Sequence, residues 1–317
     1  MNQSKKITDG ALLTAVYIAL LLIVVFVPVV VSFGIFILPI PFILYASRHG
    51  FKPTIIMFLV ALLLSLVFAT AVSLPLTVLA GIGGMTIGSA IHRNLTAYET
   101  WAQGTVGFII GIVIVVLLLQ LLLGINIYNE MDVAIEDSVT MTKTIMDQMG
   151  LGGPETDEQI EQLEKQMYDF KDIIPSSIAA ISILLAFLSQ WLSYKLMNRI
   201  ENKRLAFPPF KQLNFPIAII WIYFIALILG LINLDPDGAI YLVVANVMAL
   251  TIILIAIQGF SFIFFYADHK KVHKAVPITI LVISLLFPFL FLFIIRIIGI
   301  IDLGFSLKRR LANGNKT

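Results

Sequence analysis

The sequence lacks cysteine altogether, and charged residues make up only 13% of its 317 positions. Without cysteine there is no disulfide, no thiolate nucleophile and no cysteine metal site. A soluble domain carries about a quarter charged residues, so this chain has too little charge to cover a water-facing surface. The shortage of charge excludes an ordinary soluble protein and favours one that is surrounded by lipid.

Signatures of enzyme chemistry are also missing, since the chain has no P-loop and no His-Glu-x-x-His metal motif. The histidines fall in or beside basic segments, where interfacial or phosphate contacts are expected more than metal binding. These four residues are His49, His92, His269 and His273. We therefore predict no catalytic residue, no metal site, no cofactor and no enzymatic activity, and we expect no nucleic acid among the partners.

The residues that are abundant are apolar: 59% are hydrophobic, and the mean hydropathy is +0.99. Residues 10–47 contain no charge. As one helix they would be about 57 Å long at about 1.5 Å per residue, whereas a bilayer core is about 30 Å thick. This run must fold back, and we expect the break near Pro28 to Gly34. Residues 53–91 repeat the pattern, with a break expected near Ser73-Leu74-Pro75.

The first apolar run begins at Ala11 and lacks a small-residue cleavage site, so we interpret it as a retained helix and not as a signal peptide. Together the charge-free runs predict an all-α, polytopic transmembrane helix bundle of about eight spans. The expected spans are 11–31, 34–47, the two halves of 53–91, 101–124, 175–197, 215–233 and 239–266. Asp235-Pro236-Asp237-Gly238 predicts the turn between the last two.

Residues 275–307 do not fit a simple span, because Pro288, Arg296 and Asp302 interrupt them. A single crossing would place the basic segment 308–310 outside the cell. We therefore favour a C-terminal hairpin or re-entrant segment hinged near Pro288, with one long tilted helix as the alternative.

The distribution of lysine and arginine predicts the orientation, because cytoplasmic segments of membrane proteins are rich in both. The segments expected inside contain Lys5, Lys6, Arg48, Lys52, Arg93, Lys195, Arg199, Lys203, Arg204, Lys211, Lys270, Lys271 and Lys274. The outside segments contain only Lys143, Lys165 and Lys171. We predict a multi-pass protein of the bacterial plasma membrane with both termini in the cytoplasm.

Residues 125–172 form a hydrophilic excursion that we place outside the cell. Apolar residues recur at helical spacing from Met131 to Met149 and again from Ile160 to Phe170, and Thr156 with Gln159 predicts the cap of the second helix. The segment is therefore expected to be an acidic helical hairpin, with a lid or a docking site as functional alternatives. The domain organisation is then a membrane part at 1–124, the hairpin at 125–172 and a second membrane part at 173–317.

Small residues recur every four positions on the first helix, at Ala11, Ala15 and Ala19. Such a ridge lets another helix approach closely. It either packs the bundle or docks a partner membrane protein, and these three residues are the candidate docking site. Gly84 with Gly88, and Gly107 with Gly111, make similar pairs.

Polar residues within the expected spans are few, and buried amides usually join neighbouring helices. The candidates are Gln120, Gln190, Asn246, Gln258 and Arg296. Arg296 differs from the amides because a charge deep in the bilayer needs a partner, a cavity or access to the interface. We favour its side chain reaching toward the inner surface, near the basic segment 308–310.

Three motifs together resemble the YybS-like family of uncharacterised bacterial membrane proteins. They are Ile7-Thr8-Asp9-Gly10-Ala11-Leu12-Leu13-Thr14-Ala15, Ile257-Gln258-Gly259-Phe260-Ser261, and Gly299-Ile300-Ile301-Asp302-Leu303-Gly304-Phe305 followed by Lys308-Arg309-Arg310. The resemblance spans nearly the whole chain. That family is distantly similar to the substrate-binding S components of energy-coupling-factor transporters, whose first helix uses an Ala-x-x-x-Ala ridge against a coupling protein. Ala11 and Ala15 match that ridge, and the similarity covers roughly the first six helices.

The resemblance to S components implies a transport-related subunit that binds a small solute and works with a separate energising module. The acidic insert at 125–172 and the helices after Lys211 depart from that pattern, and no solute-binding residue carries over. The alternative function is a non-transporting scaffold or regulatory protein, which would dock a partner on the acidic hairpin or on the basic loop 199–211. The expected partners are the lipid bilayer, a transporter coupling module or other membrane protein, and a small-molecule solute.

Overall fold

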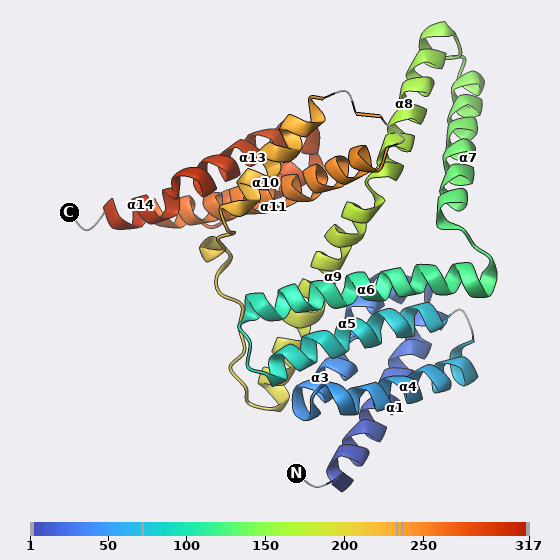
Figure 1. Ribbon diagram of the computed structural model, residues 1–317, viewed down its shortest axis with the longest axis vertical. Helices are drawn as coiled ribbons and strands as arrows, with labels where there is room; N and C mark the ends of the chain where they lie inside the picture. The colour runs from blue at the N-terminus through green and yellow to red at the C-terminus, as the bar shows by residue number, and fades with distance from the viewer. Residues whose placement is uncertain (1–2, 71–72, 233, 236–237, 315–317) are drawn as a thin grey trace. The chain divides into compact units, whose positions relative to one another are not determined.

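The computed structural model describes residues 3–70, 73–232, 234–235 and 238–314, excepting the side chains of 28–32, 122–123, 289 and 313–314. Every regular element within those residues is a helix. The predicted all-α fold class is therefore confirmed, and the helices are shown in Figure 1. Pro236 and Asp237 of the expected turn lie outside the described residues, while Gly238 N–H donates to Asp235 O at 2.9 Å.

The chain divides into two compact units: unit 1 comprises Met1–Lys171 and Ile178–Phe207, and unit 2 comprises Asp172–Ser177 and Pro208–Thr317. Unit 1 holds α1 (Gln3–Phe26), α2 (Pro28–Ile37), α3 (Ile40–His49), α4 (Phe51–Ala69), α5 (Leu74–His92), α6 (Ala97–Leu123), α7 (Ile127–Gln148), α8 (Pro154–Asp172) and most of α9 (Ile174–Ile200). Unit 2 holds η2 (Phe210–Gln212), α10 (Ala218–Gly230), α11 (Ala239–His269), α12 (Ala275–Leu286), α13 (Pro288–Phe305) and α14 (Leu307–Gly314). By contacts, α9 from Ile178 onward therefore groups with the N-terminal helices.

Both long charge-free runs break where the sequence predicts. The first is interrupted at Val27, whose backbone is extended, and α2 then begins with Pro28 at its first turn. The second is interrupted between Ala69 and Leu74, and the Ser73 hydroxyl donates to Thr70 O at 2.7 Å. Proline suits the first turn of a helix because its missing N–H would have no partner there.

Six helices among the described residues are long and apolar enough to cross a membrane, namely α1, α4, α5, α6 (counted to Leu121), α9 and α11. Three further apolar segments are shorter: Phe33–His49, Ala218–Gly230 and Ala275–Leu286. The first two of these correspond to expected spans at 34–47 and 215–233. The segment Phe33–His49 is not one continuous helix, because Pro39 separates α2 from α3.

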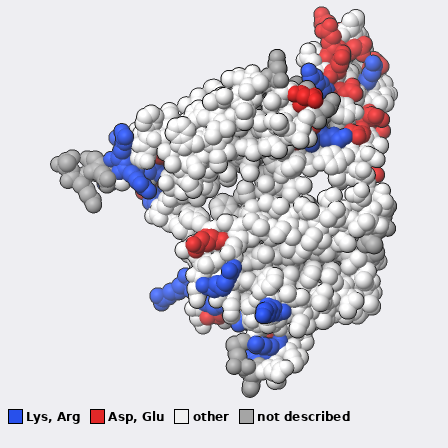
Figure 2. Space-filling model, in the orientation of Figure 1, with Lys and Arg blue, Asp and Glu red and all other residues white. Residues whose placement is uncertain are grey.

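The hydrophilic excursion is a helical hairpin of α7 and α8, joined at Gly150 with a left-handed φ of 71°. Ion pairs join the two helices, from Lys143 to Asp157 at 3.0 Å and from Lys171 to Asp132 at 2.5 Å. The acidic side chains gather over this hairpin (Figure 2). The capping prediction at Thr156 is wrong, because α8 begins at Pro154 and the Thr156 hydroxyl donates to Leu151 O. Pro154 supplies the first helical turn without a hydroxyl cap.

The core of unit 1 forms where α3, α5 and α6 pack together, with α1 and α4 beside them (Figure 1). Glycine allows this close packing, since a Cβ at Gly84 would lie 2.7 Å from Pro39 O and one at Gly88 would lie 2.6 Å from Ile43 O. The predicted pair Gly84 and Gly88 therefore packs the bundle. Thr96 and Glu99 form a capping box that starts α6, four residues before the helix start predicted at 101.

Unit 2 is built around α11, against which α10 and α13 pack. The backbones of α11 and α13 are in direct contact, because a Cβ at Gly259 or Gly299 would lie 2.1 Å from the carbonyl oxygen of Ile295 or Ile255 respectively. The segment 275–307 is broken at Phe287 into α12 and α13. This break agrees with the hairpin expected near Pro288 and not with one continuous helix.

Replacing Gly259 with Ala should destabilise unit 2, because the added Cβ would collide with the Ile295 carbonyl, which is backbone and cannot rotate away. Overpacking of this kind costs about 1–3 kcal/mol or more. The thermal midpoint of the purified protein in detergent should fall clearly. Gly230→Ala is the matched control, since its Cβ would meet only Val244 at 4.0 Å. Equal midpoints for the two variants would contradict the close helix contact.

The orientation in the membrane is a separate prediction, and the natural absence of cysteine makes it simple to test. Glu158→Cys in α8 should react with a membrane-impermeant maleimide in intact cells. Ala312→Cys in α14 should react only after permeabilisation, because the basic residues of α14 favour the cytoplasm. Labelling of Ala312→Cys in intact cells would place that end outside.

Candidate functional site

One face of α1 packs into unit 1. Leu13, Tyr17, Leu21 and Val24 are buried, and the Tyr17 hydroxyl donates to Thr77 Oγ1 of α5 at 2.8 Å. The spacing of three or four residues is that of one helix face. This buried face fixes the rotation of α1, and so it decides which residues the helix presents outward.

The small-residue ridge lies on the outward face. Ala11, Ala15 and Ala19 are all exposed. They are not used to pack unit 1, in contrast to Gly84 and Gly88 on α5. A small-residue ridge on an exposed face leaves room for another chain to approach the α1 backbone closely.

A groove of about 890 Å³ runs between α1 and α4, and the ridge forms part of its wall. Gly10, Ala11 and Ala15 line it from α1, and Ile56, Val60 and Leu64 line it from α4. Most of the polar residues that line it lie toward the N-terminal ends of these helices. They are Gln3 and Lys6 from α1, Lys52 from α4 and Tyr45 from α3, with Thr14 farther along.

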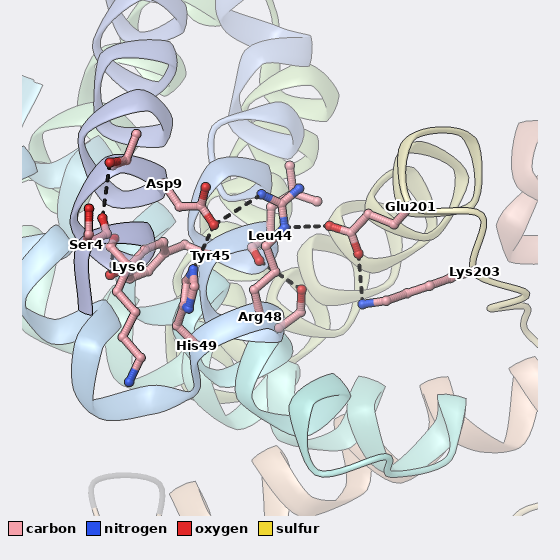
Figure 3. Close-up of polar contacts among 11 residues, drawn as sticks. Ser4, Lys6, Asp9, Leu44, Tyr45, Arg48, His49, Glu201 and Lys203 are labelled. Carbon is pink, nitrogen blue, oxygen red and sulfur yellow. Dashed lines mark hydrogen bonds and ion pairs between the residues drawn. The ribbon is translucent and has the colours of Figure 1, made fainter. Parts of the chain in front are cut away.

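A cluster of charged side chains lies beside this groove, at the start of α1 (Figure 3). His49 Nε2 lies 2.9 Å from Asp9 Oδ2, and Arg48 Nη1 lies 3.9 Å from the same oxygen. Arg48 Nε also donates to Glu201 at 2.6 Å, and Lys203 pairs with Glu201 at 2.8 Å. The cluster ties α1, α3 and the segment after α9 together at one end of unit 1.

Burial by itself would raise the pKa of the Glu201 carboxyl, but hydrogen bonds from Lys203 and Arg48 outweigh it, so the pKa lies below its ordinary value of 4.5. Glu201 is therefore ionised at neutral pH and balances two cations. This cluster has the composition of a structural clamp, because each of its charges faces an opposite one.

Lys6 and Lys52 lie near this cluster but do not belong to it. Among the described residues neither forms an ion pair, whereas Arg48, His49 and Lys203 all do. The Tyr45 hydroxyl donates to the backbone carbonyl of Lys6 at 3.2 Å, which holds the first turns of α1 against α3. The Lys6 amino group carries no contact in Figure 3. Two unpaired lysines thus line one end of the groove.

The prediction that His49 contacts the interface or phosphate is wrong. The structure buries this side chain against Asp9, with 2% of it exposed. The signal was available, since Asp9 and Arg48-His49 bracket the first charge-free run. A run that folds back brings its two ends together.

The predicted intramembrane amides are in different environments. Gln190 is fully buried in unit 1, where its amide donates to Ala97 O at 2.9 Å and to the Tyr194 hydroxyl at 2.8 Å. Asn246 joins α11 to the 172–177 segment of unit 2 by donating to Asp172 O at 2.7 Å and accepting from Ser176 N–H at 2.8 Å. Gln120 is exposed on α6. The first two join helices or segments, as buried amides usually do.

Gln258 is at the centre of a buried polar network in unit 2. Its amide donates to Asp302 at 2.6 Å, and its carbonyl accepts from Phe215 N–H at 3.0 Å. Lys308 lies 3.5 Å from Asp302 and donates to Leu213 O at 2.7 Å. Burial lowers the pKa of the Lys308 ammonium, although Asp302 opposes this effect. The network joins the second and third of the sequence motifs, and every group named has a partner.

Arg296 lies on α13, half-buried, with its guanidinium 5.2 Å from the centre of the Phe293 ring. It lines a groove of about 420 Å³ together with Phe260 and Pro288. The aromatic contact is a cation–π interaction, which eases the burial of a charge in apolar surroundings. Arg296 and Asp302 are not in contact. This separation was expected, because residues six apart do not share a helix face.

A comparison with protein families matches residues 15–303 of the chain, which is most of its length. The chain belongs to the DUF2232 family of predicted membrane proteins. This DUF2232 chain is also 28% identical over 311 residues to the uncharacterized protein YybS of Bacillus subtilis (strain 168), with 98% of the chain and 100% of YybS covered. The resemblance to the YybS-like family is thereby confirmed. No solved structure matches.

In this DUF2232 protein, Glu201→Gln should lower the free energy of unfolding at pH 7 by about 1–3 kcal/mol, because Arg48 and Lys203 lose a charged acceptor. Since the folded-state pKa of Glu201 lies below 4.5, its contribution is complete above that pH. It is lost as the pH falls through the folded-state value.

The measurement is thermal unfolding in detergent between pH 7 and pH 3.5. The wild type should approach the Glu201→Gln variant as the pH falls. Glu158→Gln is the control, because Glu158 is exposed and, among the described residues, forms no ion pair. A constant difference between wild type and Glu201→Gln across this range would contradict the ionised clamp.

Proposed function

We propose that this chain is the membrane subunit of a transport assembly, which handles a small solute and docks a separate energising module on α1. The observation that carries the proposal is the exposure of Ala11, Ala15 and Ala19 on the outward face of that helix. Small residues at a helix surface permit close helix–helix contact within lipid. The proposed docking site is this ridge.

Two features support a docking role for α1. Its other face is firmly held, through Tyr17 in the core and through Asp9 and the Lys6 carbonyl in the clamp. The ridge is therefore presented on a fixed helix, so little conformational freedom is lost when a partner binds. The Ala-x-x-x-Ala spacing also matches the ridge by which S components contact their coupling protein.

The second candidate is a scaffold or regulatory protein, and the same ridge would serve it. Its other expected surface, the basic loop 199–211, is less basic than its sequence suggests. Lys203 is paired with Glu201, and Lys211 is paired with Asp268 at 2.6 Å. Arg199 and Arg204 are exposed. The ridge is thus the stronger docking surface of the two.

Site-specific crosslinking tests the proposal. A single cysteine at Ala19, carrying a photoreactive maleimide, should crosslink in cells to a membrane partner that copurifies with cytoplasmic ATPases. Ala102→Cys is the matched control, because Ala102 is an exposed alanine on α6. Adding Ala15→Leu should reduce the Ala19 crosslink by roughly 5- to 150-fold, since overpacking an interface costs about 1–3 kcal/mol. Ala102→Leu should leave it unchanged.

The identity of the crosslinked protein separates the two candidate functions. An energising module supports the transport assembly, whereas a membrane protein without an ATPase favours the scaffold. A crosslink from Ala19 no stronger than that from Ala102 would contradict docking on the ridge, both for the transport assembly and for the scaffold.

A further inference from the structure

The two unpaired lysines lie at the polar end of a groove whose remaining wall is largely apolar. Lys6 belongs to the start of α1, and Lys52 follows the first residue of α4. Both line the groove, with the amide of Gln3 beside them. The neighbouring Arg48 and Lys203 are paired with Glu201, whereas Lys6 and Lys52 form no ion pair among the described residues, so both present positive charge to the groove.

The rest of the groove suits a hydrocarbon chain. Ile56 and Val60 line it from α4, opposite Gly10 and Ala11 of α1. Gly10 has no side chain and Ala11 has only a methyl group, so neither fills the space between the two helices. The volume of about 890 Å³ lies within the range of about 300–1,000 Å³ typical of small-molecule sites.

We propose that this groove binds an anionic phospholipid, with its phosphate between Lys6 and Lys52 and an acyl chain along α4 toward Leu64. The occupant follows from charge complementarity along one axis. A basic end next to an apolar trough matches an anionic headgroup joined to a hydrocarbon tail. Basic pockets between transmembrane helices are a known way to recognise such headgroups.

A zwitterionic lipid is a poorer fit, because its own ammonium group would be repelled by the two lysines. Soluble phosphate is a poorer fit as well, since it would leave the apolar wall uncovered. Burial of an acyl chain contributes about 0.8 kcal/mol per methylene group when the chain leaves water. A lipid in the bilayer already has its acyl chains out of water, so the groove wall adds little of this free energy. The selectivity for an anionic headgroup therefore comes from the two lysines.

The lipid site does not depend on the proposed energising module, but a lipid bound there would affect the docking of that module. Ala11 and Ala15 belong to both the groove wall and the docking ridge, so a bound lipid and a docked partner would compete for these two residues. Ala19 lies on the ridge and not among the residues that line the groove. The lysines therefore test the lipid, and Ala19 tests the partner.

The experiment measures lipid retention by the purified full-length protein in detergent, using native mass spectrometry with added phosphatidylglycerol or phosphatidylcholine. The wild type should retain phosphatidylglycerol preferentially. Lys6→Gln and Lys52→Gln should each weaken this binding about fivefold, and the double variant about 25-fold, because one basic residue near an anionic surface contributes about 1 kcal/mol. Lys5→Gln is the matched control, since Lys5 is exposed and adjacent in sequence but does not line the groove.

The apolar wall is tested separately on α4. Val60→Trp should fill the groove and displace phosphatidylglycerol, whereas Val67→Trp should not, because Val67 is exposed on the same helix but does not line the groove. Both positions are exposed, so neither substitution should prevent folding.

Three results would overturn the proposal: equal retention of the two lipids, an equal effect of Lys5→Gln and Lys6→Gln, or displacement of the lipid by millimolar inorganic phosphate. Failure of the Ala19 crosslink even in the Lys6→Gln/Lys52→Gln double variant, with lysine-dependent lipid binding intact in the wild type, would sink the docking proposal alone. Loss of lipid selectivity with an intact crosslink would sink the lipid proposal alone.

Discussion

The fold of unit 1 depends on one constraint: an uncharged run longer than the bilayer is thick cannot cross it once and must turn back. The turn after α1 brings the ends of residues 10–47 to the same end of the unit. Asp9 then meets Arg48 and His49, which are far away in sequence. Because the buried face of α1 is fixed by Tyr17 and its N-terminal turns by this clamp, the outward position of Ala11, Ala15 and Ala19 follows.

Glycine supplies the second requirement, which is close approach of helices where apolar side chains alone give little driving force. Lipid tails are as apolar as leucine, so helices in a membrane gain more from tight packing and interhelical hydrogen bonds than from hydrophobic burial. Unit 1 uses Gly84 and Gly88 for this purpose, and unit 2 uses Gly259 and Gly299. In unit 2 the glycine contact lies next to Gln258, which bonds Asp302. Packing and polar pairing therefore occur at the same helix crossing.

Much of this architecture could be predicted from the sequence, because charge and proline interrupt apolar runs at definite places. The break before Pro28, the break near Ser73, the acidic hairpin and the division near Pro288 were all predictable on those grounds. The rotation of each helix about its own axis could not be predicted in this way. Small residues at four-residue spacing look alike whether they face inward, as Gly84 and Gly88 do, or outward, as Ala11 and Ala15 do. The unpaired state of Lys6 and Lys52 was also hidden, since it depends on which cations Asp9 and Glu201 neutralise.

The position of Lys308 in the unit 2 network has a consequence for how the protein is made. Its ammonium lies 3.5 Å from Asp302 and bonds Leu213 O and the Ser261 hydroxyl. A ribosome delivers these groups in sequence order, so the Leu213 carbonyl and the Ser261 hydroxyl are made 95 and 47 residues before their lysine partner. Asp302 precedes Lys308 by only six residues, so these two charges are made almost together. Unit 2 therefore completes its native polar pairing only once α14 has been made.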